Sequence, residues 1–164
     1  MKDSARLPSL DEGALVDLAR ALAPALAAGG VVYLRGDLGA GKTTFARALL
    51  QALGVGERVK SPTYSLIESY RTGDLDIHHL DLYRIADPGE LEWLGLDALW
   101  RPGSLVLVEW PQRGGDRLPA ADLVLSLAHA GIRRDLVAES GGSARGHDLV
   151  TLLAQGLLAP PVKR

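Results

Sequence analysis

A glycine-rich segment with one lysine and one threonine is the part of the sequence best suited to chemistry. Residues 36–43 read Gly-Asp-Leu-Gly-Ala-Gly-Lys-Thr and match the G-x-x-x-x-G-K-[ST] pattern of phosphate-binding loops. The glycines let backbone amides close around phosphate oxygens, Lys42 adds positive charge toward the β and γ phosphates, and the Thr43 hydroxyl can ligate Mg²⁺. The pattern predicts a site for a nucleoside triphosphate. Its expected contacts are Asp37, Leu38, Gly39, Ala40, Gly41, Lys42, Thr43 and Thr44.

Mg²⁺ needs hard oxygen ligands beyond one hydroxyl, and two carboxylates compete for that role. Glu109 closes the apolar run 105–108, and ligands of open α/β sheets bind beyond the carboxyl ends of such strands. In the strand expected over residues 75–84, alternation places Asp81 on the face opposite the neighbouring leucines. Either carboxylate could hold the metal or orient an attacking water, and the strand-end argument favours Glu109.

Thr63 is a candidate for sensing the γ-phosphate. It lies in Ser61-Pro62-Thr63-Tyr64, after the first helix, where a threonine can order a loop around nucleotide and Mg²⁺ as GTPase switch loops do; the alternative is an ordinary Ser-Pro turn. The two histidines before Asp81 read as structural strand residues, and no role is assigned to them.

The choice of base follows from an absent residue type. The chain contains no asparagine, so the Asn-Lys-x-Asp element by which GTPases read guanine cannot exist in it. Asp81 is also not followed by a glycine three residues later, which the switch of those proteins requires. The sequence therefore favours ATP over GTP.

The elements that must position these residues alternate between strands and amphipathic helices. Residues 31–34 read as a buried strand before the loop, and residues 45–53 as a helix after it. The other expected elements are a helix up to residue 26 capped at Ser9, a hairpin of 64–70 and 75–84, a helix over 88–100, a strand over 105–108, an edge hairpin of 122–128 and 134–139, and a last helix after Ser143. This order predicts an α/β fold of the P-loop NTPase kind, with three α/β/α layers and a mixed sheet whose centre is parallel and whose hairpins are antiparallel.

Length and composition limit the classes of protein. A chain of 164 residues predicts a single domain over residues 1–164, with frayed ends at 1–8 and 159–164. The lack of cysteine excludes disulfides and thiol catalysis, no apolar run approaches the ~20 residues of a membrane span, and no signal-peptide pattern is present, which fits a cytoplasmic enzyme. A net charge of −2 argues against tight direct binding of nucleic acid.

Four linked motifs resemble the TsaE (YjeE) family. They are Gly-Asp-Leu-Gly-Ala-Gly-Lys-Thr-Thr-Phe at 36–45, Val-Lys-Ser-Pro-Thr-Tyr at 59–64, His-Leu-Asp-Leu-Tyr-Arg at 79–84 and Leu-Val-Glu-Trp-Pro-Gln at 107–112. The resemblance covers about residues 10–155, and four motifs in order make chance agreement improbable.

The resemblance implies a bacterial cytosolic ATPase required for N6-threonylcarbamoyladenosine at position 37 of tRNA. In that family, TsaE works with the TsaD and TsaB pair, which transfers the threonylcarbamoyl group from an adenylate made by TsaC. ATP hydrolysis is thought to reset the complex between turnovers. The resemblance thus implies the cofactors ATP and Mg²⁺, contact with tRNA only through the partners, and no membrane association.

The resemblance also assigns roles to individual residues. By family match, Lys42 binds phosphate, Thr43 and Glu109 ligate Mg²⁺, and Asp81 lies near the metal and the γ-phosphate. Trp110 matches a functional tryptophan, and Thr63 belongs to a switch-like loop. Asp11 falls in the segment 10–12 that encloses adenine, and Arg133 stands in for the arginine of a family Gly-Arg pair. The expected reaction is phosphoryl transfer to water, slow in the isolated protein and accelerated by partners.

Two other classes stay open at this stage. A small-molecule kinase would use the same phosphate loop with an arginine-rich lid, for which residues 113–117 are the one candidate stretch. A non-catalytic, nucleotide-gated adaptor would use ATP only to close the Thr63 loop and create a docking face.

Overall fold

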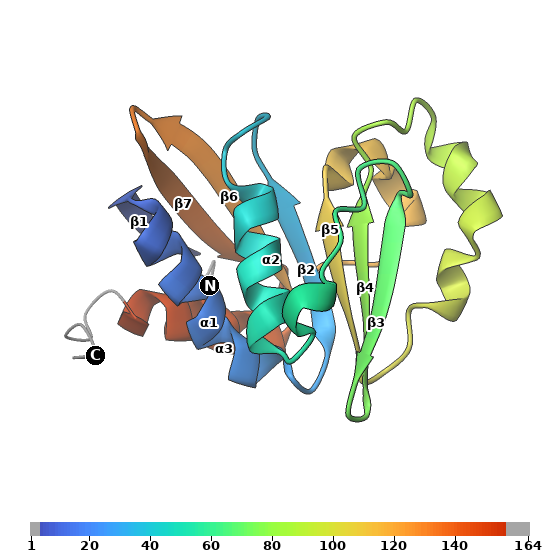
Figure 1. Cartoon of the computed structure of the whole chain (residues 1–164), viewed down its shortest axis with the longest axis horizontal. Coiled ribbons are helices and arrows are strands. Elements are labelled where there is room, and N and C mark those ends of the chain that lie inside the picture. The colour runs from blue at the N-terminus through green and yellow to red at the C-terminus, as the bar shows by residue number, and fades with distance from the viewer. Residues whose placement is uncertain (1–3, 157–164) are drawn as a thin grey trace.

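The computed structural model describes residues 4–156, whose strands form one mixed sheet in the order β1-β7-β6-β2-β5-β4-β3 (Figure 1). The strands are β1 (Ser4–Leu10), β2 (Gly30–Arg35), β3 (Ile67–Thr72), β4 (Leu75–Asp81), β5 (Ser104–Glu109), β6 (Leu123–Ala130) and β7 (Arg133–Ser140). The α-helices are α1 (Glu12–Leu26), α2 (Lys42–Ala52) and α3 (Ala144–Gly156), and the 3₁₀ segments are η1 (Gly56–Arg58), η2 (Pro88–Leu94), η3 (Leu96–Ala98), η4 (Pro111–Arg113) and η5 (Gly115–Arg117). The predicted frayed end at 159–164 lies outside the described residues.

The centre of the sheet is parallel and its flanks are antiparallel. Strand β2 pairs in parallel with β5 on one side and β6 on the other, and β4 pairs in parallel with β5. The pairs β1–β7, β6–β7 and β3–β4 are antiparallel. This arrangement confirms the predicted α/β fold with a mixed sheet. It also gathers the carboxyl ends of β2, β4 and β5 at one edge, which is where open α/β sheets bind ligands.

The α-helices and the 3₁₀ segments cover different parts of the sheet. Leu22, Phe45 and Leu149, from α1, α2 and α3, belong to one buried core with the inward side chains of the strands. A second core joins Leu80 and Val108, on the other face of β4 and β5, to apolar residues of η2 and η3. Strands β4 and β5 therefore bury side chains on both of their faces, as parallel central strands must.

The helix predicted over residues 88–100 is instead two 3₁₀ segments, η2 and η3. Gly95 separates them with φ 63° and ψ 37°, a left-handed conformation that ends a helix. Asp87 starts η2 by accepting a hydrogen bond from the Gly89 amide at 3.0 Å. The apolar spacing of this segment is real, but the glycine stops the helix from propagating.

The N-terminal residues 4–8, which we expected to be frayed, form most of strand β1. This strand pairs with β7 and buries Leu7. The prediction that the β6–β7 hairpin lies at the edge of the sheet is therefore wrong. The sequence does not predict this strand, because Pro8 interrupts it and few of its side chains are buried. Proline is tolerated only in such outer strands, where one row of amides needs no partner.

Helix α1 begins at a different cap from the one predicted. Asp11, rather than Ser9, accepts the hydrogen bond of a first-turn amide, that of Ala14, at 2.8 Å. Ser9 adopts φ 58°, and its amide donates to the side chain of Asp135 in β7 at 2.8 Å. The β1 strand therefore occupies the residues that a longer capping motif would have used.

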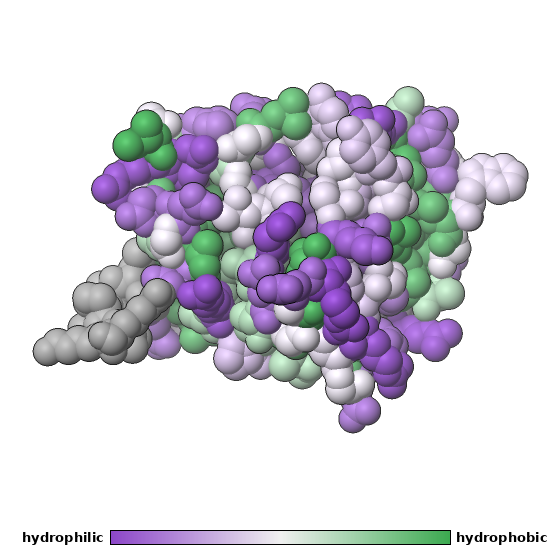
Figure 2. All heavy atoms as spheres, viewed as in Figure 1, coloured by the Kyte–Doolittle hydropathy of each residue, from purple (hydrophilic) through white to green (hydrophobic). Residues whose placement is uncertain are grey.

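Strand β3 forms the other border of the sheet and starts later than predicted, at residue 67. The Leu66 amide donates to the carbonyl of Pro62 at 2.8 Å, which closes a turn before the strand. Charged residues such as Arg71 lie on this outer strand, and Figure 2 shows hydrophilic side chains gathered over the hairpin that it forms with β4. Charge on an outer strand opposes pairing with another chain.

Within residues 4–156, no helix has the length and apolar character needed to cross a membrane.

Candidate functional site

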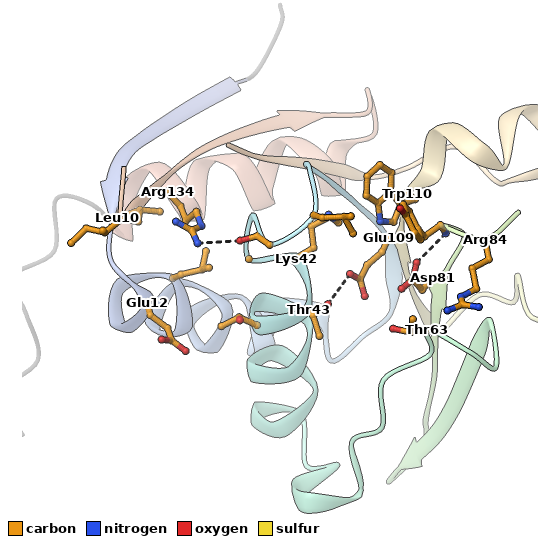
Figure 3. Close-up of a pocket in the computed structure, with 17 residues that line it drawn as sticks. Leu10, Glu12, Lys42, Thr43, Thr63, Asp81, Arg84, Glu109, Trp110 and Arg134 are labelled. Atoms are coloured by element: carbon orange, nitrogen blue, oxygen red, sulfur yellow. Dashed lines mark hydrogen bonds between the residues drawn. The ribbon is translucent and has the colours of Figure 1, made fainter. Parts of the chain in front are cut away.

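A cleft of about 430 Å³ opens at the edge where β2, β4 and β5 end (Figure 3). Most of the predicted site residues line it, namely Leu38, Gly39, Gly41, Lys42, Thr43, Thr44, Thr63, Asp81, Glu109 and Trp110. In Figure 3, Lys42 and Thr43 lie in the middle, the two carboxylates and Thr63 lie on the β4 side, and Leu10, Glu12 and Arg134 lie on the side of α1 and β7. The cleft thus joins segments that are far apart in the sequence.

The phosphate loop requires glycine for two different reasons. Gly41 has φ 108°, a conformation that other residues rarely adopt, directly before the first turn of α2. Gly36 approaches β6 so closely that a Cβ there would lie 2.5 Å from the Leu127 carbonyl oxygen. The loop consequently presents its amides and the helix N-terminus to the cleft, which is an arrangement that binds anions.

The β6–β7 hairpin holds this loop from the side. His129 Nε2 lies 3.1 Å from the carbonyl oxygen of Leu38, and Arg134 Nη2 donates to that of Gly39 at 3.0 Å. Neither residue was predicted from the sequence, because nothing local links them to the loop. The arginine predicted at the site was Arg133, but its guanidinium donates to the Ser9 carbonyl at 3.1 Å, whereas Arg134 lines the cleft.

Lys42 is buried and holds its charge over the loop. Its Nζ donates to the carbonyls of Gly36 at 2.5 Å and Asp37 at 2.9 Å. Burial lowers the pKa of the Lys42 ammonium, and the charge of Glu109 works in the opposite direction. Since its partners are carbonyl oxygens, phosphate oxygens could replace them with a gain in electrostatic energy.

Trp110 places an aromatic ring beside this lysine. The ring centroid lies 4.4 Å from Lys42 Nζ and 5.0 Å from the centroid of Tyr83. The residue has φ 57° and ψ 49°, although it is bulky, and its amide donates to the Leu34 carbonyl at 3.3 Å. Such left-handed conformations of non-glycine residues cluster at functional sites. The backbone bend therefore directs the indole into the cleft.

Glu109 connects the phosphate loop to strand β4 through both of its oxygens. Its Oε1 accepts a hydrogen bond from Thr43 Oγ1 at 3.2 Å, and its Oε2 lies 2.7 Å from His79 Nε2. His79, to which the sequence analysis assigned no role, is as deeply buried as the glutamate. The spacing contained a signal for this contact, because His79 shares the strand face of Asp81, two residues away.

Asp81 lies directly beside Glu109 across the β4–β5 pair. Its Oδ1 accepts a hydrogen bond from the Tyr83 amide at 3.0 Å. Burial raises the pKa of the Asp81 carboxyl, and the neighbouring Glu109 charge raises it further. Two adjacent carboxylates and the hydroxyl of Thr43 form a set of hard oxygens that could hold a divalent cation.

This pKa shift predicts that Asp81→Asn stabilises the protein without nucleotide or metal. In the pH window from the ordinary pKa of 3.8 up to the raised folded pKa, the folded chain keeps the proton more tightly, so the free energy of unfolding falls as pH rises. Above that window, an amide avoids the cost of the buried charge. A gain of about 1 kcal/mol would raise the Tm by about 2–4 °C in a domain of this size.

Thermal melts in a metal-free buffer, at a series of pH values, would measure this difference. The advantage of Asp81→Asn should be full at neutral pH and vanish in acid. Asp74→Asn, at an exposed turn position, is the matched control and should melt like the wild type. An equal or lower Tm of Asp81→Asn at neutral pH would contradict the assigned burial cost.

The segment around Thr63 borders the β4 side of the cleft. The hydroxyl oxygens of Ser61 and Thr63 lie 2.7 Å apart, and Thr63 lines the cleft. Tyr64 is exposed, and the Arg84 guanidinium lies 4.4 Å from the centroid of its ring. A cation stacked on an exposed ring is a weak contact, so ordering of this segment by a ligand would meet little resistance.

Four of the predicted contacts, Asp37, Ala40, Asp11 and Arg133, lie outside the cleft lining. Ala40 is buried under the loop, and its amide donates to the Asp37 carbonyl at 3.0 Å. Asp11 caps α1, while its neighbours Leu10 and Glu12 line the cleft instead. The roles predicted for Asp37, Ala40, Asp11 and Arg133 in nucleotide binding stay predictions.

Comparison with known proteins agrees with this geometry. A relative from Haemophilus influenzae is 48% identical over 97 residues, which are 59% of this chain and 61% of that protein. A relative from Bacillus subtilis is 42% identical over 103 residues, which are 63% of this chain and 64% of that protein. Both are named tRNA threonylcarbamoyladenosine biosynthesis protein TsaE. The match thus spans about three fifths of the length of these curated relatives.

A solved structure extends the likeness to nearly the whole chain. The crystal structure of YdiB from Bacillus subtilis aligns with a TM-score of 0.75 and 29% sequence identity, covering 94% of this chain and 97% of that one. Residues 9–136 match the family model described as Threonylcarbamoyl adenosine biosynthesis protein TsaE. This match covers most of the chain and includes the phosphate loop, both carboxylates and Trp110, so the chain belongs to the TsaE family.

Proposed function

We propose that this protein is an Mg²⁺-dependent ATPase that supports the synthesis of threonylcarbamoyladenosine in tRNA. The observation that carries the proposal is the convergence of Lys42, Thr43, Glu109 and Asp81 on one cleft at the carboxyl edge of the sheet. This set combines phosphate-binding charge with hard oxygen ligands. It is the set that phosphoryl transfer requires, because that reaction is catalysed mainly by positioning and by charge neutralisation.

The residues present fit both ATP and Mg²⁺. Amides of the loop and Lys42 would hold the phosphates, and Gly36 and Gly41 sit where a side chain would close the loop. Thr43 and Glu109, with Asp81 nearby, would hold Mg²⁺, which usually takes one or two carboxylates and completes its shell with phosphate and water. When bound, the ion neutralises charge that develops on the γ-phosphate.

The side chains of the cleft divide the remaining work. Lys42 would stabilise negative charge on the transferred group, and the carboxylate of Asp81 or Glu109 would orient the attacking water. The two described arginines that line the cleft both contact the protein itself, Arg84 through the ring of Tyr64 and Arg134 through the Gly39 carbonyl. This placement supports slow hydrolysis by the isolated protein and acceleration by a partner.

The end of the cleft near α1 and β7 would receive the adenine. Leu10, Leu38 and Ile132 line it, and the last two are large apolar side chains that are 63% and 97% exposed. A purine ring would cover this apolar surface, which water otherwise contacts. Glu12 and Arg134 lie at the same end and could bond to its polar atoms.

The pathway, the partners and the location are proposed from the family. Its curated relatives are named as tRNA threonylcarbamoyladenosine biosynthesis proteins, which supports the proposal that this chain acts in the same pathway. We propose that it does so in the cytoplasm. We further propose that it acts with TsaD and TsaB and that it contacts tRNA only through them. The net charge of −2 supports this division, because tight binding of RNA needs a basic surface.

The structure favours hydrolysis over the kinase alternative. The stretch 113–117, which would be the lid of a kinase, is folded into η4 and η5, and Arg117 donates to the side chain of Glu92. Arg113 also lies against the rings of Tyr83 and Trp110. These contacts hold the segment to the body of the protein, whereas a lid must open.

Phosphate release from ATP and GTP, with and without Mg²⁺, tests the proposal. The assay would use the protein alone and with reconstituted TsaD, TsaB and tRNA. Release that is selective for ATP, requires Mg²⁺ and rises with the partners is the expected result. A phosphorylated small molecule in place of free phosphate would support the kinase, and ATP binding without any release would support the gated adaptor.

A further inference from the structure

We propose that His79 positions Glu109 so that this carboxylate offers a single oxygen to the metal, and that His79 thereby favours Mg²⁺ over Ca²⁺. This inference rests on the proposed use of a metal-bound nucleotide. It assigns His79 the role of a positioning residue, since its ring contacts the carboxylate rather than the nucleotide.

The register of β4 and β5 brings the two side chains together. Asp81 pairs with Glu109, and His79 pairs with Leu107, so His79 lies diagonally across from the glutamate on the same face of the sheet. His79 and Glu109 are each 2% exposed, and their Nε2 and Oε2 atoms are 2.7 Å apart. A contact this short between such deeply buried groups holds the carboxylate in one orientation.

The direction of this hydrogen bond follows from the chemistry of its partners. An ionised carboxylate only accepts, so the hydrogen must lie on His79 Nε2. His79 Nδ1 is also buried and has no hydrogen-bond partner among residues 4–156. Within residues 4–156, the ring of His79 therefore makes its hydrogen bond to Glu109 and no other. A histidine kept only to fill the core would gain nothing from burying an unpaired nitrogen.

The consequence lies in the oxygen that remains. With Oε2 bonded to His79, Glu109 turns Oε1 toward the cleft, where it accepts from Thr43 Oγ1 at 3.2 Å. Mg²⁺ demands octahedral geometry with single oxygens close to the ion, whereas Ca²⁺ accepts bidentate carboxylates and a larger shell. A glutamate that offers a single oxygen therefore suits Mg²⁺. A glutamate free to rotate and to offer both oxygens would accommodate Ca²⁺ better.

Calorimetric titration of ADP in Mg²⁺, in Ca²⁺ and in a chelator separates these cases without any hydrolysis. His79→Phe keeps the ring and removes the donor. It should reduce the gain in ADP affinity from Mg²⁺ by about 10- to 100-fold, as loss of a residue that orients a metal ligand does. The affinity in Ca²⁺ should fall much less, so the preference for Mg²⁺ narrows. The affinity in chelator should match that of the wild type.

Two further variants exclude a merely structural effect. His79→Gln places an amide donor near the position of Nε2 and should restore most of the Mg²⁺ preference. His78→Phe makes the same chemical change one residue away, where Nδ1 lies 2.8 Å from the Ser69 hydroxyl on the other face, and should behave like the wild type. If His79→Phe does not fold in a circular dichroism melt, His79→Asn replaces it, because its shorter side chain withdraws the donor from Oε2.

The outcomes decide between the alternatives. An unchanged Mg²⁺ preference in His79→Phe, or a glutamine variant that behaves like the phenylalanine one, would overturn the inference. So would a wild-type protein whose ADP affinity gains nothing from Mg²⁺. A wild type that binds ADP more tightly with Mg²⁺ but releases no phosphate from ATP would refute the proposed hydrolysis and leave the role of His79 intact.

Discussion

Replacing Lys42 by alanine should lower Mg²⁺-dependent hydrolysis of ATP by at least about 100-fold, because removing one preorganised electrostatic donor typically costs that much. Lys42 is the buried cation of the cleft and contacts the Gly36 and Asp37 carbonyls rather than a carboxylate. Arg134 also contacts the loop, but through the Gly39 carbonyl rather than those of Gly36 and Asp37. The binding of ATP should weaken as well, since the ammonium contacts the ground state in addition to the transition state.

The loss should not come from unfolding. The alanine removes the cost of burying a cation, and burial already lowers the pKa of this ammonium. The Tm without nucleotide should therefore stay close to that of the wild type. Lys60→Ala removes the same group from an exposed position outside the cleft and serves as the control in the phosphate-release assay. Equal rates in Lys42→Ala and Lys60→Ala would show that the loop is not the phosphate site.

The change Glu109→Gln should have the second largest effect, a loss of about 100-fold in hydrolysis at saturating ATP, which corresponds to about 3 kcal/mol of charge stabilisation by the metal. Glutamine keeps the size of the side chain but removes its charge. Its amide must also point a donor toward either Thr43 or His79, and an ionised carboxylate in the wild type accepts from both of those groups. The variant should thus lose the metal ligand and its orientation together.

The assay can separate this effect from nucleotide binding. ADP affinity in chelator should be nearly unchanged in Glu109→Gln, whereas the gain in affinity from Mg²⁺ should be lost. Glu57→Gln, at an exposed position in η1, is the matched control. Wild-type hydrolysis by Glu109→Gln would exclude this carboxylate as a metal ligand and leave Asp81 as the remaining candidate.

The parts of the site that could be predicted are those whose residues are contiguous in the chain. The phosphate loop is a single run between a strand and a helix, so its motif and its flanks were sufficient to place Lys42 and Thr43 in the cleft. Strand alternation placed Asp81, and the end of a buried strand placed Glu109. These inferences succeed because backbone periodicity and strand direction are local properties.

Other features depend on strand partners and could not be predicted. Strand β1 is weakly apolar and interrupted by Pro8, and it forms because β7 supplies its hydrogen bonds. His129 and Arg134 support the phosphate loop only because β6 lies beside β2. The prediction of one helix over residues 88–100 was wrong, because the left-handed backbone of Gly95 divides this segment despite its favourable apolar pattern.

By itself, the sequence determined the α/β fold, the position of the glycine-rich loop between a strand and a helix, and the family, because each depends on a local run or on motifs in a set order. Only the tertiary structure decided that His79 contacts Glu109, that Arg134 rather than Arg133 lines the cleft, and that Trp110 lies against Lys42. The first two contacts depend on sheet register, which arises only when distant strands pair and is therefore not encoded in a short stretch of the chain. The third depends on the left-handed backbone of Trp110, a conformation that bulky residues rarely adopt and that the sequence does not predict.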